Sequence, residues 1–267
     1  MINCKLLIIN LLYKNMKSVL LLLLIGGFTV YSSAQTTGGI VKYQKQVPLR
    51  EKLGDEWIGY KDQVPEMAAF NYLLYFSSIE SLFSDNSKEN EAPSPIIKKA
   101  MWTVNRWARP HVKTLKIYFN RDKKLQVRQT EFMTRIFREE LDMPKYKWKM
   151  GSATKEILGY KCMQAEIDLE GNKIIAWFTA DIPVPAGPEN YYGLPGLMLE
   201  VNVNHGEQVW IATSIDLTAP SKDQLFEPKE GKKVKSDQYK KIQEEKIEEW
   251  EKQQKLEKSD KIVREKK

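Results

Sequence analysis

The sequence predicts a mostly β protein with an antiparallel sheet. Apolar and polar residues alternate in several short runs between residues 39 and 215, which is the period of strands with one buried face. Short polar turns join consecutive runs, as they do in antiparallel hairpins. Two segments, residues 84–112 and 221–267, depart from this pattern, and both have helical character.

Residues 1–34 have the three parts of a bacterial secretion signal. Lys14 and Lys17 precede an apolar run over residues 18–25, and small residues end the segment at Ala34. A helix needs about 20 apolar residues to span a membrane, so this run is too short for a retained anchor. We therefore expect export, with cleavage after Ala34.

The mature chain is expected to begin at Gln35 and to be periplasmic or secreted. Cys4 lies ahead of the apolar run, which is the wrong place for lipid attachment, so we do not expect a lipoprotein. Met16 makes a more compact start for the signal than Met1. Removal of the signal leaves Cys162 as a single cysteine, so no internal disulfide is expected.

The net charge of the chain does not indicate a nucleic-acid partner. The formal charge is +7, to which Lys5, Lys14 and Lys17 contribute three, and this leaves +4 for the mature chain. Residues 35–221 hold 24 basic and 23 acidic side chains, so the body is nearly neutral. A nucleic-acid binder would need a concentrated basic face to neutralise phosphates.

The alternating runs predict nine strands. A polar turn at residues 120–124 joins the third strand to the fourth, and the fifth has lysines on one face and aromatic residues on the other. Gly171 and Asn172 supply the positive φ that a tight hairpin turn requires. The predicted strands are residues 39–47, 70–76, 115–119, 125–128, 146–150, 160–169, 173–180, 197–203 and 209–215.

Residues 84–112 are predicted to form a loop and then a short helix. Ser, Asn, Glu and two prolines dominate residues 84–95, and apolar residues then recur at helical spacing from Ile96 to Trp107. No acidic residue occurs over residues 92–121. A basic helix of this kind can contact anionic lipid, but we favour an amphipathic helix that caps one end of the sheet.

Residues 221–267 are rich in Lys, Glu and Gln and predict a solvated helix. Several Glu–Lys pairs lie four residues apart with the glutamate first, which supports an isolated helix. The apolar residues form no sustained heptad stripe, so coiled-coil pairing is not expected. We expect a protruding charged tail that stabilises the body little, after a signal at 1–34 and a β domain at 35–220.

The sequence lacks the motifs of common catalytic, metal and cofactor sites. It has two histidines, His111 and His205, and His205 lies in a polar turn sequence that explains it without a ligand role. We therefore expect no metal and no cofactor. Carboxylates are plentiful, but their spacing does not indicate a catalytic pair.

The most distinctive segment runs from Trp177 into the strand at 197–203. Pro195 and Gly196 suit the central positions of a type II turn, which requires positive φ at the glycine. On physical grounds we favour a rigid corner of the fold over a binding loop. The residues of this candidate binding loop are Pro183, Pro185, Gly187, Pro188, Tyr191, Tyr192, Gly193, Leu194, Pro195, Gly196 and Leu197.

Residues 193–198 resemble the motif for which the GLPGLI family is named, with Met198 in place of isoleucine. The resemblance covers roughly residues 38–215, although Gln164 stands where lysine is common. Members are exported, occur mainly in Bacteroidota and have no assigned activity. The resemblance implies one curved antiparallel sheet, bowl-like or half-barrel, similar to a module attached to a secreted deglycosylating enzyme. Other matching residues are Trp148, Gly159, Tyr160, Cys162 and Trp177.

From these observations we expect a non-enzymatic envelope protein. It would bind an unidentified ligand or partner protein through the concave sheet surface and the loop at 183–195. Cys162 is expected to pack, because the strand pattern gives it no cationic neighbour to lower its thiol pKa. One alternative is a carboxylate-dependent hydrolase or glycan-processing enzyme, and another is an assembly or structural factor for outer-membrane receptors.

Overall fold

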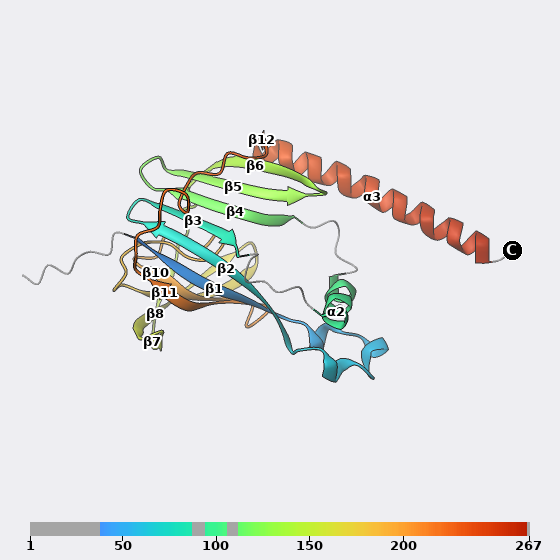
Figure 1. Ribbon diagram of the computed structural model, residues 1–267, viewed down its shortest axis with the longest axis horizontal. Coiled ribbons are helices and arrows are strands. Elements are labelled where there is room, and N and C mark those ends of the chain that lie inside the picture. The colour runs from blue at the N-terminus through green and yellow to red at the C-terminus, as the bar shows by residue number, and fades with distance from the viewer. Residues whose placement is uncertain (1–37, 87–93, 106–111, 266–267) are drawn as a thin grey trace, which may run out of the picture. The chain divides into compact units, whose positions relative to one another are not determined.

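One open sheet of twelve strands dominates the described residues of the computed structural model, which are 38–86, 94–105 and 112–265 (Figure 1). The strand order is β12-β6-β5-β4-β3-β2-β1-β11-β10-β9-β8-β7. Neighbouring strands pair antiparallel, except that β12 pairs parallel with β6. The predicted mostly β fold with an antiparallel sheet is therefore confirmed.

The elements have the following bounds. The strands are β1 (Gly38–Pro48), β2 (Met67–Ser77), β3 (Glu80–Asp85), β4 (Lys113–Asn120), β5 (Leu125–Phe132), β6 (Arg135–Asp142), β7 (Lys149–Ile157), β8 (Tyr160–Leu169), β9 (Asn172–Thr179), β10 (Leu197–Val203), β11 (Gln208–Asp216) and β12 (Lys232–Val234). The helices are η1 (Arg50–Lys52), η2 (Asp55–Trp57), η3 (Lys61–Gln63), α2 (Pro95–Asn105) and α3 (Ser236–Glu265).

Several boundaries differ from the predictions. Strands β3, β6 and β12 were not predicted, and β3 occupies the start of the expected loop at 84–112. The strand predicted at 146–150 instead begins at Lys149. Tyr146 and Trp148 precede it and are half-buried, so the alternation marked an extended segment rather than a strand.

The sheet curves around residues 180–196, which connect β9 to β10. The ring of Tyr192 stacks on Phe119 of β4 with centroids 5.0 Å apart. The Gln126 side chain of β5 donates a 2.9 Å hydrogen bond to Asn190 Oδ1. β4 and β10 are five positions apart in the strand order, yet Phe119 of β4 and Leu199 of β10 share one buried core with this segment, so the sheet bends around it. The single curved sheet is thus confirmed.

The main core lies on the inner face of this curve. Inward-facing residues of β1 and β2, such as Val41 and Leu74, are buried against Ile182 and Leu194 of the connecting segment. Burial of each such side chain contributes about 1.5–3 kcal/mol. The connecting segment is therefore part of the core rather than an open loop.

Helix α2 covers one end of the sheet, as predicted. Its Ala100 is buried in a separate cluster with Trp57 and other residues of the connection between β1 and β2. We call this group the tip cluster. Its buried members are Leu49, Leu53, Trp57, Val64, Ala68 and Ala100.

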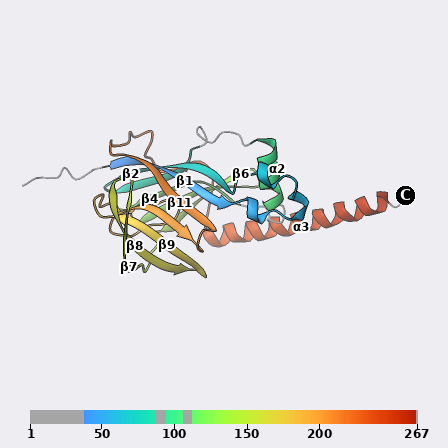
Figure 2. The ribbon, with the colours of Figure 1, turned by 90° about the horizontal axis from the view of Figure 1, so that it is seen from below.

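The tail does not simply protrude. Leu225 packs on the outer face of the sheet, against Tyr118 and its neighbours, and Pro228 accepts a 2.9 Å hydrogen bond from Arg138 of β6. Val234 of β12 and Tyr239 of α3 are buried against inward-facing residues of β5 and β6. The expectation that the tail packs little is wrong for its first part, and Figure 2 shows the rest of α3 extending beyond the sheet.

Some predictions fall outside the described residues. These are the signal peptide at 1–34 with its cleavage after Ala34, and His111 with the end of the predicted basic helix. Within the described residues, no helix is both long enough and apolar enough to cross a membrane.

Two truncations test the packing of the tail. Ending the chain after Ser221 removes Val234 and Tyr239, so we expect the free energy of unfolding to fall by at least about 3 kcal/mol. Ending it after Trp250 keeps Val234, Tyr239, Ile242 and Ile247, which form the contacts with the sheet, and should change this free energy little. Urea denaturation gives both values. Equal midpoints for the Ser221 truncation and the full chain would contradict this packing.

Candidate active site on the inner face of the sheet

The segment between β9 and β10 is folded by its own backbone. The N–H of Val184 donates to the carbonyl of Ile182 at 2.8 Å, and the N–H of Ala186 donates to Val184 at 2.7 Å. These three-residue turns centre on Pro183 and Pro185, whose fixed φ suits this geometry. The sequence Pro-x-Pro thus predisposes the chain to the rigid corner that we favoured.

The type II turn predicted at residues 194–197 is wrong. Gly196 has no left-handed φ, whereas Gly193 takes a φ of +97°. The N–H of Gly196 instead donates to the carbonyl of Leu194 at 2.8 Å, which makes another three-residue turn around Pro195. Glycine is still required, because a Cβ at Gly196 would lie 2.0 Å from the carbonyl oxygen of Thr179.

Most residues of the candidate binding loop face the protein interior. Pro183, Gly193 and Pro195 are exposed, and Pro185, Tyr191 and Tyr192 are half-buried. The buried members are Gly187, Pro188, Leu194, Gly196 and Leu197. The loop is therefore largely packed, and its two tyrosines keep part of their surface accessible.

Glu189, which no sequence motif singled out, lies beside these tyrosines. It is half-buried and has a φ of +53°, in the left-handed region that side chains other than glycine rarely adopt. Such strain clusters at functional sites. One signal was available, because Glu189 is the only acidic residue over residues 182–198.

The Glu189 carboxyl is held in an environment that favours its neutral form. Its pKa is raised above the ordinary value, chiefly because burial disfavours the charged form. Lys45 and Arg128 act in the opposite direction and lower this pKa, but burial outweighs them. A carboxyl of this kind can keep its proton closer to neutral pH and donate it.

Strand register places partners of Glu189 on one face of the sheet. Lys45 pairs with Trp210, and Tyr72 pairs with Tyr43, two residues from Lys45 in β1. Side chains two residues apart in a strand share a face. The site is thus assembled from strands that are far apart in the sequence.

Two aromatic rings from neighbouring parts of the sheet contact each other near the carboxyl. Tyr72 contacts Trp210 edge to face at 5.0 Å, and the Lys45 ammonium lies 4.8 Å from the Trp210 ring centroid. Burial, with the charges of Asp85 and Glu189, raises the pKa of Tyr72 to about 12. We call this group the Glu189 site, and its members are Lys45, Tyr72, Arg128, Tyr146, Glu189, Tyr191 and Trp210.

Arg128 gives the site an additional donor. Its Nη1 lies 3.9 Å from the buried carboxylate of Glu139. Among the described residues, its buried Nε has no hydrogen-bond partner. A buried unpaired donor is costly. The site therefore combines the Glu189 carboxyl, whose pKa is raised, with two cations and several tyrosine hydroxyls.

Comparison with known proteins adds a family to this geometry. Residues 96–241 match the model of the family described as N-glycanase peptide, N-terminal domain. The chain belongs to this family. No protein of curated function matches it.

Two solved structures share the fold of this N-glycanase family member. They are structures of PNGF-II in space groups P21 and C2, each with a TM-score of 0.53 and 19% sequence identity. They cover 77% and 78% of this chain, which in turn covers 33% and 32% of theirs. The chain therefore spans about a third of the length of PNGF-II.

The family match corrects two expectations. Membership of the GLPGLI family, inferred from residues 193–198, is wrong, because the matching model is that of the N-glycanase N-terminal family. A short motif of Gly, Leu and Pro specifies a backbone corner, which is weak evidence of ancestry. The expected non-enzymatic binding role is also wrong, and the match favours the glycan-processing alternative.

The other residues singled out in the sequence have structural positions. Trp148 Nε1 donates to the carbonyl of Tyr192 at 3.0 Å and so tethers the connecting segment. Gly159 takes a φ of +80° in the turn before Tyr160. Trp177 lies under the Lys155 ammonium, which is 4.4 Å from its ring centroid.

Cys162 is fully buried in the main core. Burial raises the pKa of its thiol to about 11, although Lys155 across the β7–β8 pair lowers it. The thiol therefore stays protonated and unreactive at neutral pH. This fits the predicted packing role, while the expected absence of a cationic neighbour does not hold.

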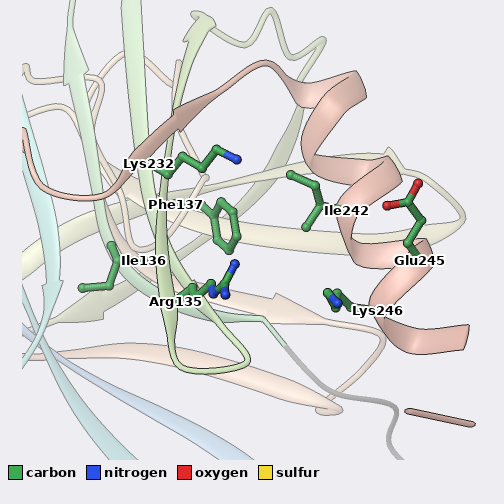
Figure 3. A pocket seen from close by; sticks show the side chains of 7 residues that line it. All are labelled: Arg135, Ile136, Phe137, Lys232, Ile242, Glu245 and Lys246. Atoms are coloured by element: carbon green, nitrogen blue, oxygen red, sulfur yellow. The ribbon is translucent and has the colours of Figure 1, made fainter. Parts of the chain in front are cut away.

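A separate pocket of about 400 Å³ lies between α3 and the edge formed by β6 and β12 (Figure 3). Phe137 and Ile242 face each other across it. Its charged groups are three cations and one exposed glutamate, which suit an anion better than proton transfer. The lining residues are Arg135, Ile136, Phe137, Lys232, Ile242, Glu245 and Lys246.

Metal ligands do not converge in the part of the chain that the structure describes. No three side chains of His, Cys, Asp or Glu lie there in an arrangement that could hold a metal ion. His205 lies in the turn between β10 and β11 with a φ of +57°.

A matched pair of glycine substitutions tests the corner at Gly196. Gly196→Ala places a methyl group against the Thr179 carbonyl, so we expect the free energy of unfolding to fall by about 3 kcal/mol. Gly59→Ala is the control, since a Cβ there meets nothing within 4 Å. If Gly196→Ala unfolds in urea at the same midpoint as Gly59→Ala, the close approach is not real.

Replacement of Glu189 by glutamine tests the environment of its carboxyl. A carboxyl whose folded-state pKa is raised favours folding fully below its unfolded pKa of about 4.3. That contribution is lost as the pH rises through the folded-state pKa. Glu189→Gln cannot ionise, so we expect it to raise the melting temperature at pH 7 but not at pH 4.

The control for this experiment is Glu170→Gln. Glu170 has the same φ of +53° but is exposed in the turn between β8 and β9. The substitution Glu170→Gln should leave the melting temperature unchanged at both pH values. A lower melting temperature for Glu189→Gln at pH 7 would mean that the ionised carboxylate stabilises the fold.

Proposed function

We propose that this chain is a glycan-processing enzyme that hydrolyses the linkage between an N-glycan and its glycoprotein, with Glu189 as the proton donor. The observation that carries the proposal is the Glu189 carboxyl, whose pKa is raised by burial beside several tyrosines and two cations. Membership of the N-glycanase N-terminal family supports the substrate class. Because the chain spans about a third of PNGF-II, its activity as a separate chain is part of the proposal.

The residues of the site supply the chemistry of hydrolysis. Water adds its oxygen to the electrophilic carbon of the linkage while the bond to the leaving nitrogen breaks. Protonated Glu189 gives its proton to that nitrogen, and a proton from the attacking water returns to the carboxylate. Lys45 and Arg128 stabilise the carboxylate between these two proton transfers, because their charges favour its ionised form.

The walls of the site suit a sugar substrate. Aromatic rings present apolar faces, and their polar ends remain available for hydrogen bonds. Burial raises the pKa of Tyr72 and of Tyr191, so both hydroxyls keep their protons and can donate. The export expected from residues 1–34 would bring the site to extracellular glycoproteins.

Glycan release from a purified glycopeptide, followed by mass spectrometry, tests the proposal. We expect Glu189→Gln to lower the rate by about 100-fold or more, since glutamine cannot transfer the proton. The rate of the wild-type chain should fall as the pH rises through the raised pKa of Glu189, because the donor is then ionised.

Glu156→Gln is the matched control, because Glu156 is exposed on β7 and lies outside the Glu189 site. It should release glycan at the wild-type rate. The proposal fails if the wild-type chain releases no glycan from any glycopeptide, or if Glu189→Gln retains full activity.

A further inference from the structure

A second pocket, of about 500 Å³, lies beside the tip cluster. The connection between β1 and β2 forms one side of it, and helix α2 forms the other. Its volume is within the range of about 300–1,000 Å³ that small-molecule sites occupy. Nothing in the Glu189 site accounts for it.

Aromatic side chains form the apolar part of this tip pocket. Tyr60 is 56% exposed, so its ring is accessible to a ligand. Trp57 is buried at the base, and the Lys99 ammonium lies 5.7 Å from its ring centroid. The pocket therefore has one fixed ring and one accessible ring.

Polar groups surround these rings. The pocket is lined by the Glu56 carboxylate, the Lys99 ammonium and the Thr103 hydroxyl. The Thr103 hydroxyl donates to the Lys99 carbonyl at 2.9 Å, so its oxygen remains an acceptor. A sugar ring has an apolar C–H face and a rim of hydroxyls that both donate and accept. The aromatic rings of the pocket can contact the apolar face of a sugar, and its polar groups can bind the hydroxyls.

The charge around the pocket favours a neutral occupant. Residues 49–66 and 94–105 together carry five basic and five acidic side chains. Binding to an anionic lipid surface draws on an excess of basic residues. This balance argues for a sugar over a membrane, although the exposed side chain of Ile58 lies close by.

The tip pocket and the Glu189 site share one face of the sheet. Lys45 and Val47 are two residues apart in β1, so their side chains point to the same side. Val47 and Phe70, the partner of Lys45 in β2, pack against the tip cluster. Two residues of strand span roughly 7 Å. Strands β1 and β2 thus contribute side chains to both regions on this face.

We propose that the tip pocket is a second sugar subsite, which binds an uncharged outer residue of the same N-glycan whose linkage is cleaved at Glu189. The choice of N-glycan rests on the proposed function. Tyr60 stacks on the sugar ring, and Glu56, Lys99 and Thr103 bind its hydroxyls. The subsite determines preference among glycans and takes no part in bond cleavage.

Calorimetry with a free neutral biantennary N-glycan tests this subsite, because that probe has no linkage to cleave. We expect Tyr60→Ala to weaken binding by about tenfold, as one aromatic contact is lost. Ile58→Ala is the matched control, since Ile58 is 71% exposed yet does not line the pocket. The chitobiose core alone should bind equally to wild type and Tyr60→Ala. An unchanged melting temperature establishes that both variants fold.

The outcomes separate this inference from the proposed function. Equal glycan affinity for wild type and Tyr60→Ala overturns the subsite, whatever Glu189→Gln does to cleavage. Loss of binding to anionic lipid vesicles in both Tyr60→Ala and Ile58→Ala, with glycan affinity unchanged, overturns it in favour of a membrane contact. Glycan binding that depends on Tyr60 in a chain that cleaves nothing supports the subsite and overturns only the enzymatic proposal.

Discussion

The contact of the β9–β10 connection with β4 and β5 is the constraint on which the rest of the structure depends. Stacking of Tyr192 on Phe119 and the hydrogen bond between Gln126 and Asn190 join parts of the sheet that are five positions apart in strand order. The sheet must therefore curve, and the connection fills its inner face. Glu189 directly precedes Asn190, so the curvature also buries its carboxyl.

Strands with a clear alternation of apolar and polar residues could be predicted from the sequence, and β3 and β6 could not. In β3, Leu82 packs on the outer face and Phe83 on the inner face, so no alternation is visible. In β6, the buried inner face includes the carboxylate of Glu139, which reads as polar. The tail covers these strands from outside, and its packing depends on contacts that local sequence does not encode.

The candidate site could also be predicted only in part from the sequence. Local chemistry indicated a rigid corner, because Pro183 and Pro185 restrict the chain wherever they occur. The importance of Gly196 was predicted for the wrong reason, since the real restriction is a backbone approach to Thr179. Glu189 was missed because the burial that raises its pKa arises only in the folded protein. Lys45 and Arg128, which lower this pKa, come from remote strands.

The two edges of the sheet are protected by different means. Strand β7 is mostly exposed and its pairing with β8 is interrupted by a bulge, which discourages a further strand from adding. Strand β12, which follows β7 to β11 in the chain, pairs with residues 137–139 of β6 and so covers the middle of that strand. Until β12 docks, a folding intermediate presents β6 as an open template for another molecule. The tail thus guards the protein against aggregation.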